Sequence, residues 1–282
     1  MSSAGVATVF GEGYEHDQKH PTWLLFPRDS EWRKQFFIPR ATEHPAKMQL
    51  HIVKAAVEYY AEPGWRILDP FAGTGSTAMA ATMGCPTTLI ELEEHFIEML
   101  REIRQKWVEE GKIESTLDMP IFSGDCRQVM KELPAEHYDM IITSPPYSVT
   151  AQVGREVTEF TGVLAERKAQ MRKYGSSEAN AMNIGRLNPF TFNEAMKRVY
   201  AACLRVLKPG GLYVSVTKDS MTAGVRKSLA LDTVRIAQSS GLEYFGDWFK
   251  WKAPGGLMQN VQKSKGYEIV EDEDIVVFRR PK

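Results

Sequence analysis

A corner rich in hydrogen-bond acceptors interrupts the middle of the chain. Residues 143–147 read Thr-Ser-Pro-Pro-Tyr and come directly after a hydrophobic run. Proline has a carbonyl oxygen but no N–H, and its ring fixes φ, so Pro145 and Pro146 form a rigid turn without competing donors. The Ser144 hydroxyl adds an acceptor, and Tyr147 offers an aromatic face. Such a corner is suited to hold an amino group by its hydrogens and to draw its nitrogen toward the tetrahedral shape of an attacking nucleophile.

A glycine-rich turn follows another short hydrophobic run and predicts a nucleotide site. Residues 69–77 read Asp-Pro-Phe-Ala-Gly-Thr-Gly-Ser-Thr, and the glycines let the backbone turn sharply and approach a ligand closely. Glu91 falls near the end of the next predicted strand, where a carboxylate can bind two ribose hydroxyls. Asp125 ends the third strand, where it can accept from an exocyclic amine.

Two ligand classes compete for this turn. Residues 73–78 also fit the G-x-G-x-x-G/A pattern of dinucleotide-binding proteins, which would make the chain a nicotinamide-dependent oxidoreductase. Asp69 stands just before the glycines, where the negative charge of a pyrophosphate is disfavoured. A ligand with a cationic sulfonium and a free amino group tolerates this carboxylate. Asp69 therefore favours a sulfonium nucleoside over a dinucleotide.

The two motifs together resemble those of the S-adenosylmethionine-dependent amino-methyltransferases of DNA. The resemblance covers about residues 44–148 and 191–280. Residues 44–48, His-Pro-Ala-Lys-Met, are similar to the family's HPxK-type segment at the methionine end of the cofactor, and residues 249–256 and 271–280 are similar to its closing hairpin. The resemblance implies an α/β protein of Rossmann-like methyltransferase fold. It implies a mostly parallel seven-stranded sheet, a C-terminal antiparallel hairpin, and S-adenosyl-L-methionine as cofactor.

The resemblance also implies roles for individual residues. The partner would be DNA, with double-stranded DNA expected, and the target base would flip out and stack on an aromatic side chain, because a base inside the duplex cannot reach such a pocket. The implied catalytic residues are Ser144, Pro145, Pro146 and Tyr147. The implied cofactor-binding residues are His44, Pro45, Lys47, Asp69, Phe71, Gly73, Thr74, Gly75, Ser76, Thr77, Glu91, Asp125 and Thr143.

The methyl acceptor is left open between several amino groups. Serine before Pro-Pro-Tyr is common in the cytosine-N4 enzymes and Asp or Asn in the adenine-N6 enzymes, some of which also carry serine, so Ser144 favours cytosine N4 and keeps adenine N6 as the alternative. RNA or a protein glutamine could accept a methyl group by the same chemistry. A non-catalytic cofactor-binding subunit is a further alternative, which the intact motifs disfavour. Methylation of cytosine carbon 5 would need a cysteine nucleophile, typically in Pro-Cys, whereas this chain has Cys85 before Pro86.

One stretch of the chain is basic. Residues 161–227 hold 12 Lys or Arg and 4 Asp or Glu, whereas the rest of the chain holds 23 Lys or Arg and 32 Asp or Glu. The net charge of the whole chain is −1. This asymmetry fits a face that contacts a nucleic acid, although a solvated helix surface would give the same counts. We expect the loop-rich insert 149–190 to contact phosphates, with a surface excursion over the cofactor as the alternative. Its cations are Arg155, Arg167, Lys168, Arg172, Lys173 and Arg186.

Alternating strand and helix patterns place both motifs on one sheet. Strands are predicted at 65–69, 87–92, 120–125, 138–144 and 212–217, with an antiparallel pair at 244–249 and 274–279. Helices are predicted between them, at about 46–60, 74–84, 96–107, 192–207 and 224–239, with a short helix between 125 and 138. This alternation indicates a mostly parallel sheet covered on both faces, with ligands at the carboxyl ends of the strands.

The composition predicts a single methyltransferase domain with an N-terminal arm. The 282 residues are 43% hydrophobic, and residues 1–40 are irregular and rich in aromatic side chains, so we expect an arm packed on a domain formed by residues 41–282. No apolar run approaches the length of a membrane-spanning helix, and the first residues lack the pattern of a signal peptide. The three scattered cysteines favour neither a metal site nor disulfides. We therefore expect a cytoplasmic protein without a membrane partner.

Overall fold

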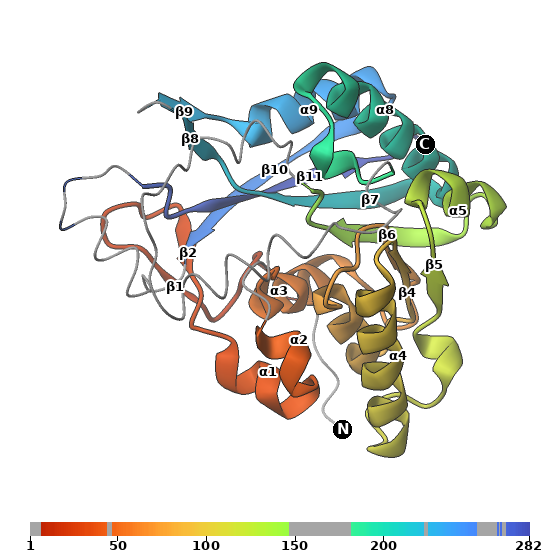
Figure 1. Cartoon of the computed structure of the whole chain (residues 1–282). Coiled ribbons are helices and arrows are strands. Elements are labelled where there is room, and N and C mark those ends of the chain that lie inside the picture. The colour runs from red at the N-terminus through yellow and green to blue at the C-terminus, as the bar shows by residue number, and fades with distance from the viewer. Residues whose placement is uncertain are drawn as a thin grey trace, which may run out of the picture.

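The computed structural model describes residues 7–43, 47–146, 182–222, 225–252, 264, 266 and 269–282. They form a nine-stranded sheet with helices on both faces (Figure 1). The sheet contains β1 (Glu15–His16), β2 (Trp23–Leu25), β3 (Ile67–Asp69), β4 (Thr87–Glu91), β5 (Ile121–Ser123), β6 (Tyr138–Thr143), β7 (Leu207–Thr217), β10 (Glu243–Lys252) and β11 (Glu273–Arg279). A separate hairpin is made of β8 (Ser220–Thr222) and β9 (Val225–Lys227).

The helices alternate with these strands. The α-helices are α1 (Ser30–Phe36), α2 (Pro39–Glu43), α3 (Leu50–Tyr60), α4 (Glu94–Glu109), α5 (Cys126–Glu132), α8 (Pro189–Val206) and α9 (Leu229–Ser239). The 3₁₀ helices are η1 (Ser76–Met83), η2 (Thr116–Asp118) and η4 (Ile184–Arg186). Among the described residues, no helix has both the length and the apolar character needed to cross a bilayer.

The order of the strands defines the ligand-binding edge. It runs β1-β2-β10-β11-β7-β6-β3-β4-β5. The strands from β5 to β7 are parallel to their neighbours, whereas β11 is antiparallel to both β7 and β10. The chain moves outward from β3 to β5 and then returns to β6 on the other side of β3, so the order switches between β3 and β6. Ligands of open α/β sheets bind outside the carboxyl ends of the strands at such a switch. The predicted Rossmann-like fold with its C-terminal antiparallel pair is confirmed.

The number of strands differs from the prediction of seven. The two additional strands, β1 and β2, come from the N-terminal segment. Leu24 of β2 pairs in parallel with Trp251 of β10, and β1 pairs antiparallel with β2. These strands are two and three residues long, too short to show an alternating hydrophobic pattern. Their pairing depends on an edge that β10 offers only in the folded sheet.

Each face of the sheet buries its own apolar layer. Successive strand residues point to opposite faces, so Ile67 and Met140 join one layer while Leu68 and Ile141 join the other. The first layer includes α3, η1 and α4, and the second includes α5, α8 and α9, as Figure 1 shows below and above the sheet. Both layers meet the sheet at β3 and β6, so these two strands are packed on both faces at the switch point.

Aromatic side chains attach the N-terminal segment to the first layer. Phe26 is fully buried, and Phe10 stacks on Phe249 of β10 with ring centroids 4.0 Å apart. The Trp107 indole N–H donates to the Phe36 carbonyl at 2.7 Å. These contacts join the described part of the N-terminal segment to the first layer.

Two helices begin later than their sequence patterns predict. The helix predicted from about Ala46 begins at Leu50. The helix predicted over 224–239 begins at Leu229, because Val225–Lys227 form β9. In the second case the three residues Val225–Lys227 pair as a hairpin strand, which a helical periodicity cannot distinguish from a first turn.

Candidate active site

The glycine-rich turn lies between β3 and the 3₁₀ helix η1. Gly73 and Gly75 have φ of 51° and 84°, in the left-handed region that favours glycine. A Cβ atom at Gly75 would lie 2.5 Å from Leu100 Cδ2 of α4. Gly75 is therefore required both by its backbone conformation and by the close packing of the turn on α4. The helix predicted after the turn is present as η1 and ends at Gly84.

Asp69 links this turn to the elbow that follows β6. Its buried carboxylate accepts hydrogen bonds from Thr77 Oγ1 and Thr143 Oγ1, both at 2.6 Å, and from the Phe71 N–H at 3.0 Å. Burial raises the pKa of Asp69, and these three hydrogen bonds oppose the rise. One carboxylate thus holds the ends of two neighbouring strands together.

Glu91 faces the same turn from the end of β4. Its carboxylate accepts from the Gly73 N–H at 2.6 Å and from the backbone N–H groups of Leu92 and Glu93 at 2.8 and 2.9 Å. Burial raises the pKa of Glu91, and the backbone hydrogen bonds lower it in part. The position suits the predicted contact with ribose hydroxyls, which stays a prediction.

Asp125 is the N-cap of α5 and lies two residues beyond the end of β5, so it does not end that strand as predicted. It caps the helix by accepting from the Arg127 N–H at 2.9 Å, and its two oxygens also bind the Arg127 guanidinium, with Nη2 at 2.5 Å. A nucleobase amine at Asp125 would share the carboxylate with this arginine. Nothing in the local sequence pattern indicated the ion pair, because residues two apart at a helix start are not usual partners.

The elbow leaves the sheet directly after Thr143. Pro145 is buried, and Ser144 and Pro146 are half-buried. A small pocket, partly open to solvent, lies beside the two prolines. Apolar residues of α8 and α9 form most of its wall, among them Phe192, Met196, Leu229 and Ile236.

The end of β7 contributes a polar group to this pocket. Thr217 lines it and is buried, and its Oγ1 has no hydrogen-bond partner among the described residues. Buried hydroxyls are normally paired, so this one is available to a ligand or a water molecule. The pocket therefore combines a mostly apolar wall with the Thr217 hydroxyl, unpaired among the described residues, and with Asp232.

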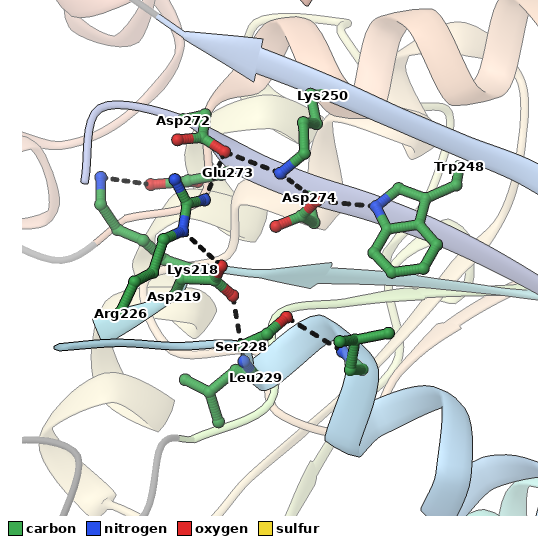
Figure 2. A network of polar contacts seen from close by, with 11 residues as sticks. Lys218, Asp219, Arg226, Ser228, Leu229, Trp248, Lys250, Asp272, Glu273 and Asp274 are labelled. Atoms are coloured by element: carbon green, nitrogen blue, oxygen red, sulfur yellow. Dashed lines mark hydrogen bonds and ion pairs between the residues drawn. The ribbon is translucent and has the colours of Figure 1, made fainter. Parts of the chain in front are cut away.

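A network of ion pairs braces the same edge of the sheet (Figure 2). Arg226 of β9 donates to Asp219 and to Asp272, both at 2.7 Å, and Lys250 of β10 lies 2.7 Å from both Asp272 and Asp274. Burial would raise the pKa of Asp272, but the hydrogen bonds from Arg226 and Lys250 outweigh it and hold the pKa below its ordinary value. The network fastens the β8–β9 hairpin to β10 and β11.

The structure describes only some of the other predicted site residues. Lys47 donates from Nζ to the Thr42 carbonyl at 2.6 Å, and Arg186 is exposed at the end of η4. The structure brings the residues of the glycine turn together with Glu91 and Thr143. The predicted residues that lie outside the described ones are His44, Pro45, Tyr147, Arg155, Arg167, Lys168, Arg172 and Lys173.

An arginine of the N-terminal segment also reaches the site and was not predicted. Arg33 of α1 is buried and donates from Nη2 to Ser76 Oγ at 3.0 Å. Its place between Trp32 and Phe36, in a stretch whose aromatic residues pack on the body, is the signal that could have indicated burial. Among the described residues, no group of three His, Cys, Asp or Glu side chains is arranged to hold a metal ion.

Residues 11–102 match the N6/N4 methyltransferase family model, which describes DNA methylases. The matched range covers about a third of the chain. It includes the glycine turn and Glu91 and ends before the elbow. The predicted resemblance to the amino-methyltransferases is confirmed by this match, without a choice between the adenine-N6 and cytosine-N4 subtypes.

Individual proteins are similar over part of their length. The tRNA (guanine(10)-N2)-dimethyltransferase of Methanothermobacter thermautotrophicus is 28% identical over 118 residues, which are 41% of this chain and 32% of that protein. The crystal structure of TrmN from Thermus thermophilus is 15% identical with a TM-score of 0.49 and covers 86% of this chain and 52% of its own. A second Thermus thermophilus protein, named as a DNA modification methylase, is 21% identical with a TM-score of 0.34, over 56% of this chain and 52% of its own. This chain thus spans about a third of the curated relative and about half of these two structures.

Proposed function

We propose that this chain transfers a methyl group from S-adenosyl-L-methionine to the exocyclic amino group of a base in DNA. Cytosine N4 is the favoured acceptor and adenine N6 the alternative. The observation that most supports this proposal is the 2.6 Å hydrogen bond from Thr143 Oγ1 to Asp69, which links the elbow to the glycine turn. Methyl transfer needs a donor and an acceptor held in line at near-contact distance, and neighbouring strand ends meet this need. The DNA methylase match supports both the methyl donor and a nucleic-acid substrate.

The charge around the turn supports a sulfonium nucleoside. The carboxyl groups of Asp69, which is buried, and Glu91, which is half-buried, adjoin the glycines. A pyrophosphate beside them would be repelled, whereas a cationic ligand with ribose hydroxyls would be bound. S-adenosylmethionine would supply an activated methyl group on its sulfonium. Glu91, which already accepts from the Gly73 N–H, would orient the ribose.

The elbow would hold the accepting amine. The exocyclic nitrogen of cytosine or adenine is a weak nucleophile because its lone pair is delocalised into the ring. Acceptors on the two amine hydrogens, from Ser144 and the Pro145 carbonyl, would favour the attacking geometry, and proline adds no donor that competes. Apolar residues beside the elbow, Phe192 and Leu229 among them, would contact the flipped base. The stacking role of Tyr147, outside the described residues, stays a prediction.

An RNA base is the second candidate substrate. The similarity to a tRNA guanine-N2 dimethyltransferase favours it, because guanine N2 is also an exocyclic amine of a nucleobase. An elbow that binds an amine by its hydrogens serves either polymer. The basic stretch 161–227 would contact phosphates in both cases.

Nucleoside analysis tests the proposal. The purified protein is incubated with methyl-labelled S-adenosylmethionine and, separately, with unmethylated DNA and unmodified tRNA, and each polymer is digested and analysed by mass spectrometry. We expect labelled N4-methylcytosine from DNA. Labelled N6-methyladenine would identify adenine instead of cytosine as the acceptor base. Labelled N2-methylguanosine from tRNA would identify RNA instead of DNA as the substrate. No label in either polymer, with a cofactor-bound protein, would contradict the proposal.

A further inference from the structure

A buried arginine of the N-terminal segment lies against the start of η1. Arg33 is 2% exposed. Its Nε donates to Asp29 at 2.8 Å, and its Nη2 donates to Ser76 Oγ at 3.0 Å and to the Met48 carbonyl. Ser76 is the first residue of η1, and Met48 is the last residue of the segment similar to the HPxK motif. Arg33 therefore reaches the junction of two segments that belong to the proposed cofactor site.

One nitrogen of this arginine lacks a hydrogen-bond partner in the part of the chain that the structure describes. Nη1 is buried and makes no hydrogen bond within the described residues. A guanidinium carries five N–H donors in a planar fork, and buried donors are nearly always paired because an unmet one costs free energy. Nε and Nη2 are already engaged. Nη1 thus offers two N–H groups to an acceptor beside the glycine turn.

The charge of Arg33 is only partly matched by its surroundings. Asp29 is the acid bound to it, and the same Asp29 oxygen also accepts the Leu50 N–H at 3.0 Å. Burial lowers the pKa of Arg33, and Asp29 opposes this. A second anion at Nη1 would stabilise the guanidinium further, since charge-assisted hydrogen bonds from arginine are strong when water is excluded.

Acidic and basic groups flank the first two residues of η1. Asp69 accepts from Thr77, and Arg33 donates to Ser76. A ligand with an α-amino acid end carries an ammonium and a carboxylate a few ångströms apart, which suits one acidic and one basic neighbour. The N-terminal end of a helix also favours an anion through its dipole and its free N–H groups.

We propose that Arg33 Nη1 binds the methionine carboxylate of S-adenosylmethionine. This inference rests on the proposed function and adds the N-terminal segment to the cofactor site. Asp29 holds Nε and so fixes the plane of the guanidinium, while Ser76 and the Met48 carbonyl hold Nη2. Nη1 is left as the group that meets the ligand. The N-terminal segment then selects nucleosides that retain the amino-acid end of S-adenosylmethionine.

Two nucleosides that differ in this end provide the test. S-adenosylhomocysteine retains the amino acid, and 5′-methylthioadenosine lacks it. Isothermal titration calorimetry measures the affinity of both for wild type, Arg33→Gln, Arg33→Lys and Lys34→Gln. We expect Arg33→Gln to weaken S-adenosylhomocysteine binding by about 10- to 100-fold and to leave 5′-methylthioadenosine binding within about twofold. Lys34, exposed and paired with Glu31 in the same helix, is the matched control and should change neither.

The outcomes separate this inference from the proposed function. Unchanged S-adenosylhomocysteine affinity in Arg33→Gln would overturn the inference. An equal loss of affinity for both nucleosides would also overturn it, because Arg33 would then only stabilise the fold of the glycine turn. Arg33→Lys keeps a cation beside Asp29, so it replaces Arg33→Gln as the test if that variant does not fold. It loses the planar fork of the guanidinium and should weaken the binding of S-adenosylhomocysteine but not that of 5′-methylthioadenosine. A wild-type protein that binds neither nucleoside would instead contradict the proposed cofactor.

Discussion

At the scale of single residues, the contact between Thr143 and Asp69 couples the two halves of the site. Thr143→Val keeps the shape of the side chain in β6 but removes the donor, leaving a buried carboxylate with one partner fewer. We expect a loss of about 1–3 kcal/mol in the free energy of unfolding and a clear fall in methyl transfer. Thr88→Val is the matched control, because Thr88 Oγ1 is bonded to the Tyr138 hydroxyl, a buried pair that does not touch Asp69. Urea unfolding and a transfer assay should show similar destabilisation but a fall in rate only for Thr143→Val.

Ser144 is the residue whose hydroxyl should act only during transfer. Ser144→Ala removes an acceptor for the amine hydrogens, so the single-turnover rate should fall about tenfold or more while cofactor affinity stays unchanged. Ser239→Ala, at the far end of α9, provides the control, since its hydroxyl donates to the Ile236 carbonyl. An unaltered rate in Ser144→Ala would remove this hydroxyl from the mechanism.

At the scale of elements, α9 forms one wall of the pocket beside the elbow. Leu229 lines the pocket, whereas Leu231, two residues later in α9, is 47% exposed and lies outside it. Leu229→Trp should fill the space proposed for the flipped base. We expect it to lower methyl transfer at least tenfold at saturating cofactor, while Leu231→Trp stays near wild type. Equal rates for the two variants would place the base elsewhere.

The ion-pair network should make the attachment of the β8–β9 hairpin depend on pH. The folded pKa of Asp272 lies below its unfolded value near 3.9, so the folded state binds fewer protons at acidic pH. The stability from this contact is complete above the unfolded pKa and is lost as pH falls through the folded pKa. Asp272→Asn should therefore show a smaller fall in Tm than wild type between about pH 5 and pH 3. Glu243→Gln, in the more exposed pair with Arg279 at the other end of β10, should follow wild type.

At the scale of the whole molecule, the N-terminal segment belongs to the sheet and its core. Phe26 is fully buried next to Trp251 of β10, with ring centroids 5.4 Å apart. Phe26→Ala should lower the free energy of unfolding by about 3–5 kcal/mol and keep a single transition if arm and body unfold together. Phe190→Ala, which removes a phenylalanine that is 75% exposed, should have little effect. A separate low-temperature transition in Phe26→Ala would show that the segment unfolds independently.

The family match and the fold agree with what local patterns predicted. Alternating strands and helices, the glycine turn and the C-terminal antiparallel pair were all expected, and each is present. These features depend on properties that act over a few residues, such as the left-handed φ of Gly75 or the missing N–H of Pro145. The helix ends were less predictable, because β9 and a helical first turn use similar residues.

The sequence by itself determined which chemical groups are present and on which kind of element they lie. Tertiary structure alone decided which of them meet. Thr143 and Asp69 are 74 residues apart and touch because β3 and β6 are neighbours at the switch in strand order. The same holds for Arg33 against Ser76, 43 residues away, and for β2 beside β10. Strand order and burial emerge from packing the entire chain at once, so no local window of sequence contains them.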